Sequence, residues 1–230
     1  MAHAATHLVA SQYYTDSATS FATADISPSA NALILLTFGV AGERTGDPVP
    51  SGGSLSYVKI ADRYNSNGVH HYFFRAQCGA SPGTFAITVT ADGAETWDSA
   101  VCVVDEWTGH NTTSPITQAD TDYGWQWVSD GVHEPAFDSA FGAGGGGYGS
   151  IANQTGSTYT PRTGWTQLGL TRNSESSYGL LVTEYRVTSD TNYGGDGDGN
   201  WAGMFGIEIA VAAAGGPSGQ IVTVYLNEIV

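Results

Sequence analysis

The sequence has few charged residues and very little positive charge. Charged residues make up 13% of its 230 residues, and 7 Lys and Arg stand against 22 Asp and Glu, for a formal net charge of −15. Lys59 is the only lysine. Because such a chain repels nucleic-acid phosphates and anionic membrane surfaces, we expect neither nucleic acid nor a membrane among its partners.

Membrane, export and cross-linking signals are also scarce. No run of about 18 apolar residues indicates a membrane-spanning helix, and no basic start followed by an apolar stretch indicates a signal peptide. We therefore expect a soluble protein made in the cytoplasm of its host. Cys78 and Cys102 are the only cysteines, which leaves two states open: buried free thiols or a single disulfide.

Helical patterns are nearly absent. Gly, Pro, Asn or Ser interrupts almost every window of the roughly 10 to 12 residues that an amphipathic helix needs. Short runs rich in β-branched and aromatic residues stand between turn signals instead, which indicates a sandwich or barrel. We expect strands at residues 32–40, 69–75, 84–90, 99–107, 180–186, 204–211 and 221–229.

Two of these segments predict their own surroundings. Residues 32–40 (ALILLTFGV) are apolar on both faces, so we expect a central strand that is covered on both sides. Residues 84–90 (TFAITVT) alternate, with Phe85, Ile87 and Val89 on one face and Thr or Ala on the other. That alternation predicts a strand with one solvated face.

One stretch of the chain is written twice. Residues 53–75 (GSLSYVKIADRYNSNGVHHYFFR) and 164–186 (GWTQLGLTRNSESSYGLLVTEYR) each begin with Gly and an apolar run. Each continues through a loop rich in Asn and Ser to an aromatic residue and Arg. Equivalent hairpins in the two halves of an eight-stranded jelly roll could produce this pattern. Glycine-aromatic-loop patterns also recur in unrelated β proteins, so internal symmetry and coincidence are both open.

The fold class that we predict is all-β, a jelly-roll-like antiparallel β-sandwich with an extra C-terminal strand. Residues 1–25 are polar, and we predict that they form an N-terminal arm. Residues 26–211 are predicted to form the sandwich domain. Residues 212–219 (AAAGGPSG) predict a linker. The apolar strand behind it, residues 221–229, could close the sandwich or make an assembly contact with a neighbouring chain.

Catalytic motifs are missing. The sequence has no G-x-S-x-G, no H-E-x-x-H and no phosphate-binding loop. The glycine-rich stretch at 142–149 (GAGGGGYG) indicates a close-packed strand or a mobile loop. His70 and His71 would face opposite sides of a strand and could not chelate one metal together.

Acidic and aromatic residues supply the remaining candidates for chemistry. Asp105, Glu106 and Glu184 lie beside aromatic residues, and a glycosidase needs two facing carboxylates. They lack the E-x-D-x-x-E pattern of jelly-roll glycosidases, so we expect exposed acids at strand ends and no catalytic residues.

The segment DGDGN offers a candidate calcium site through Asp196, Asp198 and Asn200, whose oxygens alternate along the chain. It is not an EF-hand, because Trp201 and Ile207 occupy the positions of that motif's Gly and Glu. A plain acidic turn is the alternative, and no other cofactor is expected.

The segment YGWQW offers a candidate glycan-binding surface through Trp125 and Trp127, which would share one face of a strand. Most other aromatic residues are expected to fill the core.

The order of the segments resembles a β-sandwich module of tailed-phage virion proteins, found in minor tail proteins, tail fibres and head decorations. The matching stretches are Tyr72 to Arg75 (YFFR), Val103 to Gly109 (VVDEWTG) and Gly164 to Leu168 (GWTQL), within about residues 20–211. Leu55-Ser56-Tyr57 departs from the module's first Trp motif. The resemblance implies assembly or attachment and carries no catalytic residues.

We therefore expect a non-enzymatic structural protein on the virion surface, assembled with other virion proteins and as a homo-oligomer. The alternative is a carbohydrate-binding module that recognises host-surface glycans, and the third option is a glycan-active enzyme.

Overall fold

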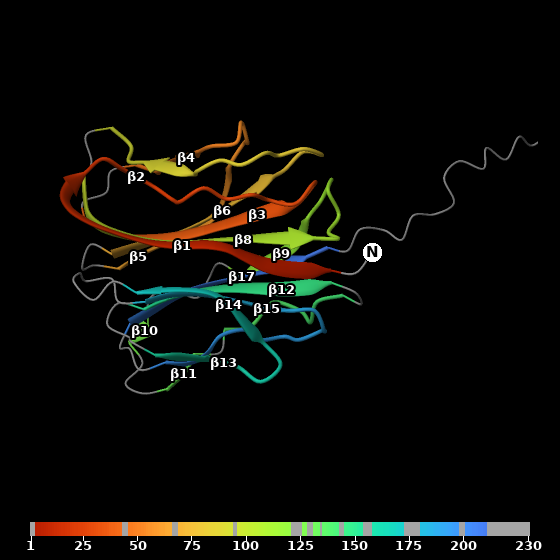
Figure 1. The fold of residues 1–230 in the computed structure, drawn as a ribbon. Coiled ribbons are helices and arrows are strands. Elements are labelled where there is room, and N and C mark those ends of the chain that lie inside the picture. Colours follow the sequence, from red (N-terminus) through yellow and green to blue (C-terminus); the bar gives the residue numbers. More distant parts are fainter. Residues whose placement is uncertain are drawn as a thin grey trace, which may run out of the picture.

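The structure is a computed structural model that describes residues 3–42, 46–65, 69–93, 96–120, 126–127, 131–133, 135–142, 145–153, 158–172, 180–197 and 201–210. The described residues form seventeen strands and no helix. All pairings between these strands are antiparallel, which confirms the all-β sandwich. Figure 1 shows four stacked layers, with two large sheets in the middle and a small sheet on each outer side.

The first half of the chain contains eight strands. They are β1 (Ala4–Ala18), β2 (Ser20–Ala22), β3 (Leu33–Gly42), β4 (Val49–Ser51), β5 (Val58–Asn65), β6 (Val69–Gln77), β7 (Thr88–Thr90) and β8 (Trp97–Thr108). The large sheet has the order β1-β8-β3-β6-β5, and the small sheet has the order β2-β7-β4. The first strand thus pairs with the last, the second with the seventh and the third with the sixth. This nested pairing defines an eight-stranded jelly roll.

The second half repeats this connectivity. Its strands are β9 (Ile116–Asp120), β10 (Gln126–Trp127), β11 (Gly131–His133), β12 (Gly146–Asn153), β13 (Tyr159–Pro161), β14 (Thr166–Arg172), β15 (Leu180–Arg186), β16 (Gly195–Gly197) and β17 (Trp201–Ile209). The large sheet has the order β10-β17-β12-β15-β14, with β9 on the same edge of β17, and the small sheet has the order β11-β16-β13. Strands β9 and β10 together take the place of β1.

The two halves also correspond residue by residue along their central strands. Ile34 of β3 pairs with Glu106, and Gly147 of β12 pairs with Glu208. A turn precedes each central strand, closed by Ala32 N–H donating to the carbonyl of Ser29 and by Gly145 N–H donating to that of Gly142. The internal repeat is therefore a repeat of the whole jelly roll, and not of two hairpins within one.

The register corrects one detail of the repeated text. Ile34 pairs with Ala76, and its equivalent Gly147 pairs with Arg186. Arg186 therefore corresponds to Ala76 and lies one position away from the equivalent of Arg75. The similar aromatic-Arg endings had suggested a match that is shifted by one residue.

The apolar interior lies in three layers. The first jelly roll encloses Phe38, Tyr72, Phe74 and Trp97 among other side chains, and the second encloses an aromatic cluster around Tyr193. Between the two large sheets lies a third layer to which both halves contribute. We call this layer the joint; its buried members are Leu33, Leu35, Ala61, Phe73, Trp107, Tyr148, Phe205, Ile207, Ile209, Val101, Val103, Ala152 and Leu181.

Several sequence predictions hold. Strand β3 is central, and its two faces contribute to the first core and to the joint. Ile87 and Val89 are buried while Thr84 and Thr90 are exposed, although only Thr88–Thr90 forms a ladder. The end of the glycine-rich stretch, residues 146–149, forms the first half of the fully buried strand β12 (Gly146–Asn153). The predicted strand at 221–229 lies outside the described residues.

The N-terminal segment differs from its prediction. The sequence predicts an arm at residues 1–25, but β1 is an edge strand of the large sheet and β2 belongs to the small sheet (Figure 1). An edge strand with many solvated side chains can be polar in composition, because only a few of its residues pack inward. In β1 these are Ala5, Leu8, Val9 and Ala10.

Candidate functional site

The acids that the sequence singled out are buried, contrary to the expectation of exposed strand ends. Asp105 and Glu184 are 0% exposed and Glu106 is 5% exposed. Asp105 lies in the joint, where its carboxylate accepts a hydrogen bond from the Tyr148 hydroxyl at 2.8 Å and lies 2.8 Å from Nδ1 of His7. Burial of a carboxylate is tolerated because these partners replace its water.

Glu106 performs a scaffold task that its equivalent in the second half repeats. Its carboxylate accepts from the backbone N–H of Ser29 at 2.7 Å and from the hydroxyl of the same residue at 2.8 Å. Glu208 accepts from the N–H of Gly142 at 2.6 Å and from the amide of Gln118 at 2.9 Å. Each glutamate therefore fastens the turn that precedes the central strand of its own half.

Glu184 lies inside the second jelly roll. It accepts from the N–H of Gly194 at 2.6 Å and from the hydroxyl of Tyr159 at 2.9 Å. Burial raises the pKa of Glu184 to about 8, against the opposing effect of these two hydrogen bonds. At neutral pH the carboxyl group is therefore largely protonated. Asp105, Glu106 and Glu184 are thus each buried and hydrogen-bonded to partners of their own, whereas the two acids of a glycosidase flank a substrate bond.

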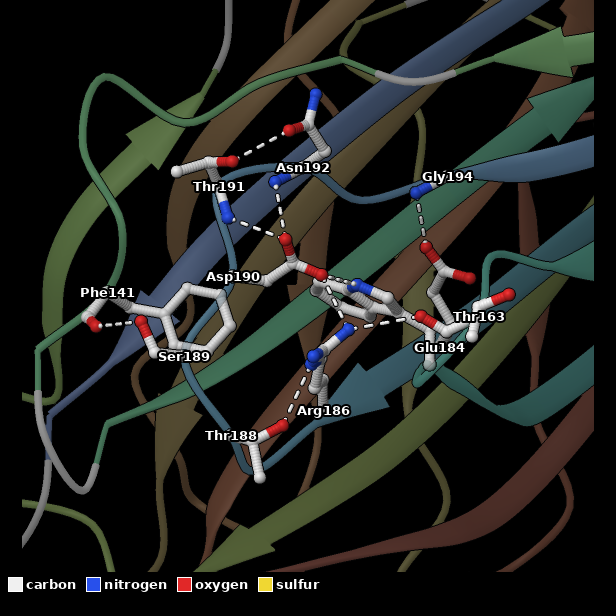
Figure 2. A network of polar contacts seen from close by, with 11 residues as sticks. Phe141, Thr163, Glu184, Arg186, Thr188, Ser189, Asp190, Thr191, Asn192 and Gly194 are labelled. Atoms are coloured by element: carbon white, nitrogen blue, oxygen red, sulfur yellow. Dashed lines mark hydrogen bonds and ion pairs between the residues drawn. The ribbon is translucent and has the colours of Figure 1, made fainter.

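A polar network next to Glu184 holds the end of β15 (Figure 2). Arg186 donates to the carboxylate of Asp190 at 2.6 Å and to the carbonyl of Thr163 at 3.1 Å. Asp190 also accepts from the N–H of Thr191 at 2.8 Å and from the indole of Trp165 at 3.3 Å. Burial would raise the pKa of Asp190, but the N–H donors and the Arg186 charge outweigh it and lower the pKa. The hydrogen bonds of Arg186 and Asp190 therefore hold neighbouring loops to the end of β15.

The joint contains a second polar group that links the two halves. The hydroxyl oxygens of Thr37 and Ser150 are 2.6 Å apart, and Nε2 of His71 is 2.9 Å from each. All three side chains are 0% exposed. Burial lowers the pKa of His71 to about 3, so the imidazole is neutral. Thr37 and Ser150 occupy equivalent positions on β3 and β12 and meet each other across the joint.

The candidate calcium and glycan residues are only partly described. Asp196 is exposed in β16, where it pairs with Val132 and Thr160. Asp198 and Asn200 lie outside the described residues, as does Trp125. Trp127 pairs with Trp201 through the backbone of β10.

The two cysteines are free and buried. The N–H of Cys78 donates to the carbonyl of Ala32, while Cys102 pairs with Phe38, six residues further along β3. Six residues of a strand span about 20 Å, far beyond the reach of a disulfide. Burial raises the pKa of Cys78 to about 11, which keeps the thiol protonated. Of the two states that the sequence left open, the structure has the free thiols.

Sequence reasoning missed one group of exposed and half-buried side chains, which we call the edge strip. It consists of Lys59, Asp62 and Tyr64 on edge strand β5 and of Asp47, which precedes β4. Lys59 Nζ lies 2.6 Å from Asp47 and 3.1 Å from Asp62. Tyr64 is 54% exposed. The available signal was Lys59, the only lysine of the chain, one position after Val58 at the start of the strand.

Fold and side-chain placement together define a tandem jelly-roll β-sandwich protein in which the buried carboxylates of Asp105, Glu106 and Glu184 are hydrogen-bonded by other side chains and by backbone N–H groups. No family model, curated protein or solved structure matches the chain. Within the described ranges, no three His, Cys, Asp or Glu side chains are grouped as metal ligands. None of the described segments is a helix that could cross a membrane.

Proposed function

We propose that the protein is a non-enzymatic structural protein on the surface of a tailed-phage virion, on the tail or as a head decoration. The observation that carries the proposal is the burial of Asp105, Glu106 and Glu184, each bonded to the scaffold and none paired with another. Catalytic acids must reach a substrate, whereas these acids fasten turns and strands. The order of motifs resembling the phage module supports the virion as the place of action.

Assembly forms the second part of the proposal. The protein joins other virion proteins and further copies of itself by β-strand contacts, and the apolar segment 221–229 behind the AAAGGPSG linker supplies one such strand. A strand donated to a neighbour replaces solvent with ladder hydrogen bonds, so it stabilises the assembly without any change in the jelly rolls.

Mass spectrometry of particles from a phage that encodes this chain tests the location. We expect the protein in gradient-banded, salt-washed virions at several to hundreds of copies per particle, and gold-labelled antibodies on the particle surface. Tailless particles provide the matched sample that separates head from tail. Presence in the soluble lysate with absence from washed particles would contradict the proposal.

Deletion of residues 212–230 tests the assembly contact. We expect an unchanged circular dichroism spectrum and a lower mass by sedimentation equilibrium. The full-length chain with Val224→Lys, which places a charge within the donated strand, should give the same lower mass. An unfolded deletion variant would instead assign the segment to the core of its own chain.

A further inference from the structure

Three members of the edge strip form a row on one face of β5, and Asp47 lies beside this row through its ion pair with Lys59. Lys59, Asp62 and Tyr64 pair with Phe74, Tyr72 and His70 of β6 in that order, and a bulge at Ile60 brings Lys59 onto the same face as the other two. The row therefore continues outward from the aromatic side chains of the first core, and its outer members are open to solvent.

Tyr64 presents a rigid aromatic platform. Its ring stacks on His70 with centroids 4.3 Å apart and planes at 26°, and His70 is only 3% exposed. His70 in turn stacks on the buried ring of Tyr72 at 6.1 Å, and Tyr72 stacks on Phe38 at 5.0 Å. One face of the Tyr64 ring packs on this stack, so the side chain already has few rotamers. A ligand that packs on the other face would therefore cost little side-chain conformational entropy.

The charged part of the strip lies next to the platform. Lys59 holds Asp47 and Asp62 on either side, with 50% of the Asp47 side chain and 29% of the Asp62 side chain exposed. Burial lowers the pKa of Lys59, but its hydrogen bonds to the two carboxylates outweigh that effect and raise it, so the ammonium stays charged. Asp62 and Tyr64 are two residues apart on one strand, a spacing of about 7 Å.

The scaffold does not require this strip, as the second jelly roll demonstrates. The equivalent edge strand β14 pairs Gln167 with Glu184, Leu170 with Val182 and Arg172 with Leu180. It therefore carries no aromatic platform and no carboxylate at the positions of Tyr64 and Asp62. The same strand in the same place folds without them, so their presence in the first half points to a task other than folding.

We propose that the edge strip binds a neutral sugar unit of a polysaccharide. The apolar C–H face of a pyranose would pack on Tyr64, as apolar surface packs on aromatic rings elsewhere. Asp62 and Asp47 would accept hydrogen bonds from adjacent hydroxyl groups, and Lys59 would donate one. The net charge of −15 disfavours anionic sugars, and the charged side chains and the bulge of β5 disfavour addition of a further strand at this edge.

Saturation-transfer NMR on the purified full-length chain tests the site, with the methyl glycosides of glucose, galactose, mannose, N-acetylglucosamine and rhamnose as probes. We expect at least one probe to receive saturation, mainly at its ring C–H protons. Tyr64→Ala should weaken that probe's binding about tenfold or more, and Asp62→Asn several-fold. Tyr64→Phe keeps the platform and should stay within about threefold of the wild type.

Tyr13→Ala is the matched control, because Tyr13 is also an exposed tyrosine on an edge strand, with 38% of its surface accessible. It should leave the signal unchanged. Absence of transfer from all five probes, or equal transfer to Tyr64→Ala, overturns the sugar site. A lower sedimentation mass of Tyr64→Ala without any sugar signal would assign the strip to a contact between copies instead. The assay needs no particle, so its outcome is independent of whether the protein belongs to a virion.

Discussion

In the first jelly roll the central strand carries the large side chains, whereas in the second it makes room for those of other segments. Strand β3 reads LILLTFGVAG, and β12 reads GGYGSIAN. Where β3 has Leu33, β12 has Gly146, and a Cβ atom on Gly146 would collide with the Trp107 ring. Trp165 and Phe141 fill the space beside Gly147 in the same way. One strand connectivity thus tolerates two opposite distributions of volume, provided that the density of packing is kept.

The same comparison holds for polar groups. Phe74 of the first half and Glu184 of the second are equivalent, because Leu36 pairs with Phe74 and its equivalent Gly149 pairs with Glu184. The first core is an aromatic stack at this point and the second a hydrogen-bonded carboxyl group. The Glu106 and Glu208 anchors and the Thr37 and Ser150 hydroxyls are instead similar in both halves. The polar contacts that the two halves share are therefore those that hold the turns and the joint together.

The largest expected effect follows from removal of the Trp107 side chain. Trp107 is 0% exposed in the joint, so Trp107→Ala should lower the free energy of unfolding by about 4 kcal/mol. Both halves contribute to the joint, and we expect a single cooperative transition in urea. Tyr13→Ala, at an exposed site, should change the free energy by less than about 0.5 kcal/mol. A loss below about 1 kcal/mol for Trp107→Ala would mean that the two sheets do not pack through this residue.

Glu184→Gln should remove the contribution of the second core's buried carboxyl group to the pH dependence of the free energy of unfolding. The native pKa is raised from 4.5 to about 8, so between these values the native state keeps a proton that the unfolded state has lost. The free energy of unfolding therefore falls as the pH rises through this window. Above it, the contribution of Glu184 no longer changes with pH. The variant should match the wild type at pH 4 and exceed it at pH 9 by on the order of 5 kcal/mol. A stability difference between Glu184→Gln and the wild type that stays the same from pH 4 to pH 9 would contradict the raised pKa of Glu184. Asp138→Asn, at an exposed site, serves as the control.

Gly146→Ala tests whether the glycine in β12 is needed to make room for the Trp107 ring of the first half. The added methyl group meets the buried indole of Trp107, and we expect a loss of about 2 kcal/mol. In a Trp107→Leu background the opposing ring atoms are gone, so the same substitution should cost less than about 0.5 kcal/mol. Equal costs in the two backgrounds, measured by urea denaturation, would remove the contact as the reason for the glycine.

The two glutamate anchors should respond alike. Glu106→Ala and Glu208→Ala each leave a turn N–H without its carboxylate partner, at a cost of about 1 to 2 kcal/mol. We expect values within about 0.5 kcal/mol of each other and hydrogen exchange that accelerates at Ser29 in one variant and at Gly142 in the other. A clear effect in one half alone would argue against their equivalence.

The sequence predicts the first jelly roll better than the second for a physical reason. Residues 32–40 are apolar on both faces apart from Thr37, so their central position follows from hydrophobicity. Strand β12 has no such pattern, because its glycines are chosen to fit side chains that lie far away in the sequence. The buried acids were misplaced for the same reason: their partners, such as Ser29 for Glu106 and Tyr148 for Asp105, are 77 and 43 residues distant.

The most direct test of the tandem packing is a disulfide across the joint. The Thr37 and Ser150 hydroxyl oxygens lie 2.6 Å apart although the residues are 113 positions apart, and sulfur atoms in their place would be within reach of an S–S bond of about 2.05 Å. Oxidative refolding of Thr37→Cys/Ser150→Cys should give a linked peptide of residues 37 and 150 by mass spectrometry, with Cys78 and Cys102 still reduced. The control pair Thr37→Cys/Thr160→Cys, which joins a buried to an exposed position, should stay reduced. A folded Thr37→Cys/Ser150→Cys protein with both new thiols free would contradict face-to-face packing of the two jelly rolls.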